Sequence, residues 1–113
     1  MKLNDVKEML SAKLITAEVD LNVEVCSAFA CDLMSDVLAF VEDQSLLLTG
    51  LINPQVVRTA EMMDMKAIVF VRGKTPTEEI IELAKESKIV LMSTEYTMYY
   101  AAGVLYKNGL GNV

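Results

Sequence analysis

The sequence predicts an α/β domain with a mostly parallel sheet and helices on both of its faces. Short unbroken apolar runs at residues 46–48 and 67–71 are typical of strands that are covered on both sides. Segments with apolar residues at helical spacing follow these runs. The connections are short, which favours parallel neighbouring strands joined by right-handed crossovers.

The first third of the chain is expected to contain two helices and two short strands. Asn4 is a candidate cap for a helix over residues 5–12. Residues 13–17 and 24–30 are predicted strands of uncertain direction. A helix is then expected from residue 31 or 32 to about 41, with its apolar positions three or four residues apart.

The middle of the chain predicts a strand, a helix and a second strand. The strand covers Ser45–Thr49. Asn53 is a good cap for the helix, and Pro54 stands at the first helical position, where its missing N–H is not needed. That helix is expected to end near residue 65, and the strand at 67–71 follows it.

The last third predicts a further helix, strand and helix. Thr75 and Glu78 have the spacing of a capping box, which predicts a helix over residues 76–87. A strand is expected at 89–92. The final helix is expected to begin at residue 94 or 95 and to reach about 107.

Size and composition favour one domain over residues 1–113 that works in the cytoplasm. The chain is 53% hydrophobic with a mean hydropathy of +0.36, which predicts a surplus apolar face and hence a homodimer. The net charge of -6 argues against nucleic acid and anionic membranes as partners. Two cysteines and no apolar leader or spanning segment fit a reducing compartment.

The turn at Arg72, Gly73, Lys74 and Thr75 resembles the end of a phosphate-binding P-loop. That motif needs a glycine five positions before Gly73, and Ile68 stands there. A solvated turn with a capping threonine is the favoured interpretation. One anion at the following helix N-terminus is the alternative.

A pair of carboxylates, Asp32 and Asp36, is expected on one face of a helix. Such a pair could bind a cation or exchange protons, and Ser35 beside it could act as a nucleophile if a base were present. The chain has no histidine, so we expect no Ser-His-Asp system, no metal site and no cofactor. Cys26, in the predicted strand 24–30, is interpreted as a small buried hydrophobe.

Binding is therefore expected at the turns that follow the parallel strands, where ligands of open α/β sheets gather. These turns are residues 49–53, 72–75 and 93–97, and each combines small or polar residues with a helix N-terminus. The final helix carries four tyrosines that suit an interface or the rim of a pocket, namely Tyr96, Tyr99, Tyr100 and Tyr106.

Three stretches together resemble the DRTGG domain family: CDLMSDVL at 31–38, LTGLINPQVV at 48–57 and STEYTMYYAAGVL at 93–105. The resemblance runs in order along nearly the whole chain. It implies the three-layer α/β fold of the N-terminal domain of HPr kinase/phosphorylase, without that enzyme's separate P-loop kinase domain. It also implies a set of motif positions: Asp32, Ser35, Asp36, Gly50, Asn53, Gly73 and Thr94. Arg72 joins this set from the turn described above.

The resemblance implies a regulatory module rather than an enzyme, because such domains occur alone or attached to CBS domains or phosphotransacetylases. Where the family has its naming threonine-glycine-glycine stretch, this chain has Cys26, Ser27 and Ala28, which lack the conformational freedom of glycine. We expect a non-enzymatic, ligand-sensing homodimer, with a phosphorylated metabolite, a nucleotide or a protein as partner. The alternatives are a small phosphate-handling enzyme that uses Asp32, Asp36, Arg72 and Lys74, or an accessory subunit of a hydrogenase or redox complex.

Overall fold

The sheet is built around strands in which almost every residue is buried. The computed structural model describes residues 1–42 and 44–112. Its strands are β1 (Lys13–Leu14), β2 (Ser27–Ala30), β3 (Ser45–Thr49), β4 (Ala67–Phe70), β5 (Val90–Ser93) and β6 (Gly111–Asn112). Their order across the sheet is β1-β5-β4-β3-β2-β6. All neighbours are parallel except β1, which pairs antiparallel with β5.

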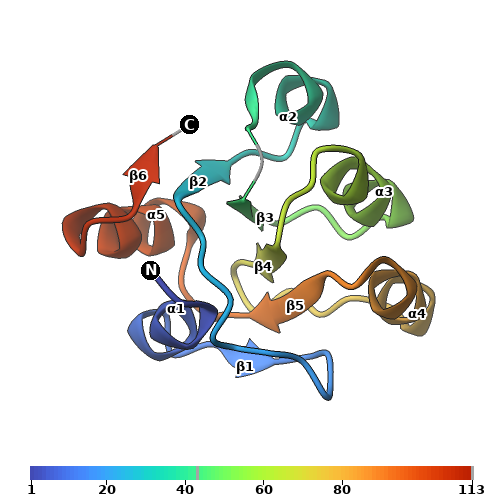
Figure 1. Ribbon diagram of the computed structural model, residues 1–113, viewed down its shortest axis with the longest axis horizontal. Coiled ribbons are helices and arrows are strands. Elements are labelled where there is room, and N and C mark those ends of the chain that lie inside the picture. The colour runs from blue at the N-terminus through green and yellow to red at the C-terminus, as the bar shows by residue number, and fades with distance from the viewer. Residues whose placement is uncertain (43, 113) are drawn as a thin grey trace.

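Helices cover both faces of this sheet, so the predicted α/β class is confirmed. They are α1 (Leu3–Met9), α2 (Met34–Phe40), α3 (Pro54–Met62), α4 (Glu78–Ser87) and α5 (Met98–Lys107). Figure 1 shows α1 and α5 on one side of the sheet and α2, α3 and α4 on the other. Alternate residues of the central strands pack into two separate hydrophobic cores. Leu46 and Leu48 lie in the core under α1 and α5, whereas Leu47 lies in the core under α2, α3 and α4. This alternation explains why the strand sequence shows no polar positions.

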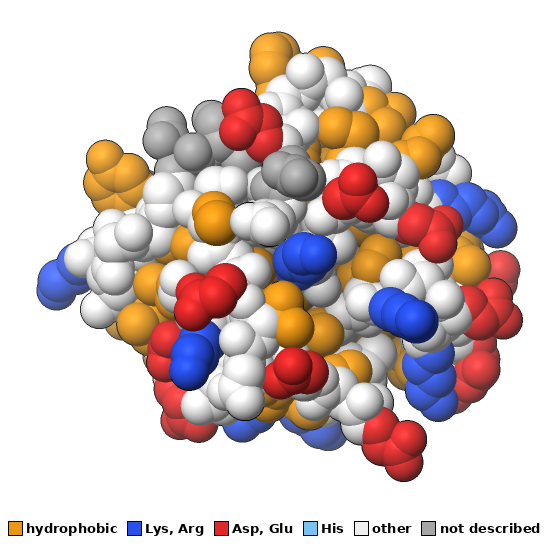
Figure 2. Space-filling model, viewed as in Figure 1, with side chains coloured by type: hydrophobic (Ala, Val, Ile, Leu, Met, Phe, Trp, Pro, Cys, Tyr) orange, Lys and Arg blue, Asp and Glu red, His pale blue; other side chains and the backbone are white. Residues whose placement is uncertain are grey.

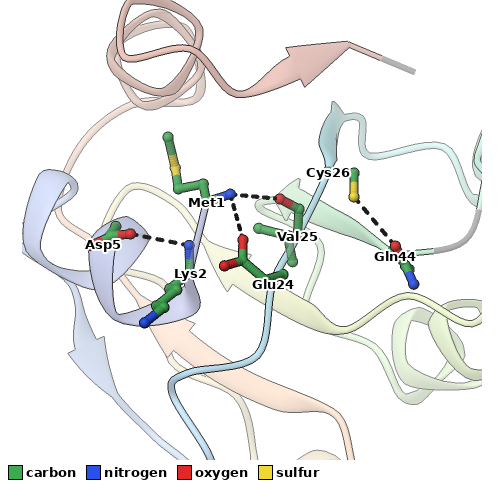
Figure 3. Close-up of polar contacts among 7 residues, drawn as sticks. All are labelled: Met1, Lys2, Asp5, Glu24, Val25, Cys26 and Gln44. Carbon is green, nitrogen blue, oxygen red and sulfur yellow. Dashed lines mark hydrogen bonds and ion pairs between the residues drawn. The ribbon is translucent and has the colours of Figure 1, made fainter.

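The N-terminal elements differ from the prediction in their limits. Helix α1 begins at Leu3 after Lys2, so Asn4 lies inside the helix and does not cap it. Asp5 accepts a hydrogen bond from the Lys2 backbone N–H at 3.1 Å, and this contact stabilises the first turn of the helix (Figure 3). The predicted strand 24–30 is shorter, since Glu24 forms only an isolated antiparallel bridge with Lys2.

Two later helices, α4 and α5, also begin further along the chain than the sequence predicts. Helix α4 is capped by Thr77, whose hydroxyl accepts from the Ile80 N–H at 3.4 Å, so the capping box of Thr75 and Glu78 is wrong. Helix α5 begins after Thr97, which caps it in the same way, and not at residue 94 or 95. The start of α3 was predicted correctly, with Asn53 accepting from the Gln55 N–H at 2.8 Å and with Pro54 at the first position.

The surface carries both signs of charge. Figure 2 shows acidic and basic side chains interspersed on the visible face, with apolar side chains between them. Within residues 1–42 and 44–112, no helix has the length and apolar character that a membrane crossing requires.

Candidate functional site

Asp32 links the ends of β2 and β3. The register pairs Ala30 with Leu48, so the residue two positions beyond β2 lies opposite Gly50. There the Asp32 Oδ1 atom accepts hydrogen bonds from the Thr49 hydroxyl at 2.9 Å and from the Gly50 N–H at 2.8 Å. Asp32 precedes α2 and its extended N-cap Leu33, so the prediction of Asp32 and Asp36 on one helix face is wrong.

Arg72 reaches the same point from β4. Its backbone is left-handed at φ 57°, and the next residue, Gly73, is left-handed as well at φ 68°. The turn is fixed to the loop after β5, since the Arg72 N–H donates to the Tyr96 carbonyl and the Gly73 N–H donates to the Thr94 carbonyl, both at 2.8 Å. A left-handed arginine is uncommon and costs roughly 1–3 kcal/mol, so the surrounding contacts must hold it in place.

The guanidinium of Arg72 lies directly over Gly50. A Cβ atom on Gly50 would stand 2.5 Å from its Nη2 atom. A side chain at position 50 would therefore displace the guanidinium. Asp32 thus bonds to the backbone of Gly50, and the guanidinium of Arg72, 40 positions further along the chain, occupies the space where a Gly50 side chain would lie. We call Asp32, Thr49, Gly50 and Arg72 the Gly50 node.

Glu95 extends the row of charged groups along this edge. A Cβ atom on Gly73 would lie 2.6 Å from the Glu95 carboxylate, so this carboxylate lies over Gly73 as the guanidinium lies over Gly50. In the described part of the chain, neither Arg72 nor Lys74 forms an ion pair within 4.0 Å. The edge therefore presents two cations next to two carboxylates, Asp32 and Glu95.

Several predicted site residues lie outside the Gly50 node, and two of them form structural hydrogen bonds. Thr94 is buried, and its hydroxyl donates to the Leu10 carbonyl at 2.6 Å and accepts from the Tyr96 N–H at 3.2 Å. Asn53 caps α3. Ser35 is exposed and Asp36 is half-buried on the first turn of α2, and the hydrogen bonds of the Gly50 node include neither side chain.

The sequence reasoning missed Glu95 as a site residue, although a signal for it exists. Asp32, Arg72 and Glu95 each stand two positions beyond the end of a parallel strand. Since residues two apart on a strand point to the same side, charges at equal offsets from paired strand ends are expected to lie in a row. The observed register pairs Phe70 with Ser93, so Arg72 and Glu95 are aligned, whereas Asp32 is level with Gly50 and Val71, one position before Arg72.

Cys26 lies at the opposite edge of the sheet. It is exposed and precedes β2, so its interpretation as a buried hydrophobe is wrong. Its thiol contacts the Gln44 Oε1 atom at 3.3 Å (Figure 3). The stretch that stands where the family has threonine-glycine-glycine thus begins at the amino edge, away from the Gly50 node.

Three hollows in the surface lie elsewhere. One of about 580 Å³ lies beside α5 over β2. Two others, of about 750 and 410 Å³, lie near Lys66 and Lys88, which precede β4 and β5. None of these three hollows is lined by residues of the Gly50 node. Within residues 1–42 and 44–112, no three cysteines or carboxylates are close enough to hold a metal ion.

Comparison with known proteins identifies the fold. No family model and no curated protein matches the chain. A solved structure that matches contains the CBS and DRTGG domains of the regulatory region of Clostridium perfringens pyrophosphatase, complexed with the activator diadenosine tetraphosphate. The TM-score is 0.71 at 17% identity, over 92% of this chain and 45% of that chain. The chain therefore has a fold that occurs in a regulatory region, and it spans less than half of that structure.

Proposed function

We propose that this chain is a regulatory domain of the DRTGG type, without catalytic activity, that binds a phosphorylated metabolite or a nucleotide at the Gly50 node. We further propose that it works as a homodimer in the cytoplasm. The observation that carries the binding proposal is the Arg72 guanidinium, held over Gly50 with no carboxylate within ion-pair distance in the described part of the chain.

The positive groups of this edge could bind an anion beside its carboxylates. Helices α3, α4 and α5 follow strands β3, β4 and β5, so their N-termini are directed to the carboxyl edge of the sheet. Free N–H groups and the helix dipole give each terminus a partial positive charge. Arg72 and Lys74 add two full positive charges there. A phosphate group would be attracted by all of them.

The carboxylates suggest how a nucleotide would be distinguished from phosphate alone. Asp32 has one oxygen engaged by Thr49 and Gly50, and Glu95 lies over the next turn. Carboxylates accept hydrogen bonds from hydroxyl groups such as those of ribose. A ligand with phosphates and sugar hydroxyls would therefore satisfy both signs of charge.

Two further observations support a regulatory function. Asp32 is occupied in joining β2 to β3, which suits an orienting group better than a general base that must be free to take a proton. The Clostridium perfringens regulatory region binds a dinucleotide activator, which motivates a nucleotide as the first probe for this chain.

Thermal unfolding with added ligand tests the proposal. The probes are inorganic phosphate, AMP, ATP and diadenosine tetraphosphate. A ligand at about 100 times its dissociation constant should stabilise the fold by roughly 2.7 kcal/mol. Replacing Arg72 by alanine should remove that stabilisation. Replacing Arg58 by alanine, an exposed residue of α3, removes the same charge elsewhere and should leave it intact.

The outcomes separate three situations. Stabilisation that both variants retain would place the ligand away from Arg72. No stabilisation by any phosphorylated probe would refute the ligand proposal. Turnover of ATP or of diadenosine tetraphosphate by the wild type, lost with Arg72→Ala, would instead favour the phosphate-handling enzyme.

A further inference from the structure

Helix α5 is apolar on its exposed side as well as on its buried side. Its inner residues Ala101 and Leu105 are buried against the sheet. Of its ten residues, only Lys107 is charged. Helix α4 has the same length, and half of its residues are charged. A surface helix normally has a polar outer face, so the outer face of α5 is suited to a covered position.

Three tyrosines project from that outer face. Tyr99 is 90% exposed, Tyr100 55% and Tyr106 71%. At roughly 200 Å² for each aromatic side chain, they expose about 430 Å². Each partner in a stable complex buries about 800 Å², so three residues supply about half of the area that a dimer needs. Tyrosine is also among the residues enriched at such interfaces.

The sheet beside α5 is incompletely covered. Two helices lie on this face and three on the other (Figure 1). The result is the hollow of about 580 Å³ over β2, with Ala28 and Ala30 in its floor and the three tyrosines along its wall. Ala30 is exposed although it belongs to a strand of the sheet. The hollow is large enough to take apolar side chains from another molecule.

Gly103 occupies the middle of the exposed face of α5. A Cβ atom there would meet nothing within 4 Å, so packing inside the chain does not require glycine. Glycine inside a helix costs about 1 kcal/mol relative to alanine. Tyr99 and Tyr100 lie one turn before it and Tyr106 lies one turn after it. This arrangement fits a second helix that crosses α5 at Gly103, because a missing side chain lets two helices approach closely.

We infer that α5 forms a two-fold symmetric dimer interface with α5 of a second copy, the two helices crossing antiparallel at Gly103. Under two-fold symmetry each contact is made twice. Antiparallel crossing at Gly103 then places Tyr99 against the partner subunit's Tyr106, and Tyr106 against the partner subunit's Tyr99. The inference rests on the proposed self-association and is independent of the proposed ligand.

Sedimentation equilibrium over a range of micromolar concentrations tests this interface. The replacement Gly103→Ala should raise the stability of the monomer through helix propensity, yet it should raise the dissociation constant of the dimer about tenfold or more. A glycine with only a structural role would not show this opposition. A dimer that is unchanged or tighter in this variant would overturn the crossing at Gly103.

Charge pairs test the orientation. The double variant Tyr99→Glu/Tyr106→Glu places like charges opposite each other and should be monomeric. The double variant Tyr99→Lys/Tyr106→Glu places opposite charges there and should dimerise at least tenfold more tightly than the first. Equal association of the two variants would overturn the antiparallel arrangement. Met62→Glu is the control, because Met62 is 70% exposed on α3 and its replacement should leave the dimer intact.

Failure of the surface and failure of self-association give different results. A wild-type chain that stays monomeric throughout the range refutes the dimer itself. If the dimer tolerates both double variants but is disrupted by Phe40→Glu on α2, self-association is retained and the interface lies on α2 rather than on α5. Ligand stabilisation measured on the same samples reports on the Gly50 node separately.

Discussion

Thr59 has a buried hydroxyl that no described residue satisfies. Its side chain lies in α3 and is fully buried, and its Oγ1 atom has no hydrogen-bond partner in residues 1–42 and 44–112. Valine has the same shape, with a methyl group in place of the hydroxyl. The replacement Thr59→Val should therefore stabilise the protein, because the unfolded chain hydrates that hydroxyl and the folded chain does not.

The magnitude follows from three terms. Removing an unsatisfied buried hydroxyl gains about 1–3 kcal/mol. Threonine and valine have nearly equal helix propensities, so the backbone term is close to zero. The buried methyl group adds up to about 0.8 kcal/mol. We expect a gain of about 2 kcal/mol in the free energy of unfolding and a rise in Tm of about 10 °C for a domain of this size.

Thr49 provides a matched control for this measurement. It is also fully buried, but its hydroxyl donates to Asp32 and accepts from the Leu51 N–H at 3.2 Å. The replacement Thr49→Val should destabilise by about 1–3 kcal/mol, since it removes a hydrogen bond to a charged group and leaves the Leu51 N–H without its partner.

Urea unfolding of the wild type and both variants measures the two effects. The midpoints should move in opposite directions while the m-value stays constant, because the buried area is unchanged. A loss of stability in Thr59→Val, similar to that in Thr49→Val, would refute the reasoning. It would mean that the Thr59 hydroxyl has a hydrogen-bond partner in solution.

Three further replacements follow from backbone conformation and close approach. Gly73→Ala should lower the free energy of unfolding by about 1–3 kcal/mol, since position 73 is left-handed and a Cβ atom would meet the Glu95 carboxylate; a neutral effect in urea unfolding would contradict it. Lys88→Gly should add about 1 kcal/mol, because Lys88 ends α4 with φ 59°; calorimetry showing a lower Tm would count against this explanation. Gly50→Ala should leave the free energy of unfolding nearly unchanged, since the flexible end of Arg72 can move aside. The same replacement should weaken the binding of a phosphorylated probe about tenfold, because it displaces the guanidinium. An unaltered affinity in titration calorimetry would show that the position of the guanidinium is unimportant.

The centre of the sheet could be predicted because its sequence leaves one interpretation. Apolar runs such as 46–48 have no polar position, so they fit only strands with both faces covered. The start of α3 was equally clear, since Asn53 and Pro54 give the same start independently. In both places local sequence and tertiary packing favour the same structure.

Helix starts failed where several capping residues stand in a row. Thr75 and Thr77 can both cap α4, and Thr94 and Thr97 can both cap α5. In each pair the later threonine caps the helix. The hydroxyl of the earlier Thr94 instead donates a hydrogen bond to the Leu10 carbonyl, 84 positions away. No local rule contains such a contact.

The members of the Gly50 node come from two different predictions. Gly50 and Arg72 lie in turns that follow parallel strands, where binding is expected, whereas Asp32 was expected from its spacing to Asp36 and from the family resemblance. The expected pairing of Asp32 with Asp36 was wrong because a hydrogen bond to Gly50 N–H holds Asp32 outside the helix. Helical spacing can be recognised in the sequence, but the hydrogen bond between the Asp32 carboxylate and the Gly50 N–H depends on the tertiary structure.

The link between the two ends of the chain has a consequence for synthesis on the ribosome. The Thr16 hydroxyl accepts from the Leu91 N–H at 3.1 Å across 75 positions, and β5 is the one partner of β1 among residues 1–42 and 44–112. At about 5–20 residues per second, the N-terminal segment would wait roughly 4–15 s for its partners. During that time the apolar side chains of α1, such as Leu3 and Val6, lack part of the sheet against which they pack. A chaperone that binds short apolar segments would find its target here in the nascent chain, and the target would disappear when β5 arrives.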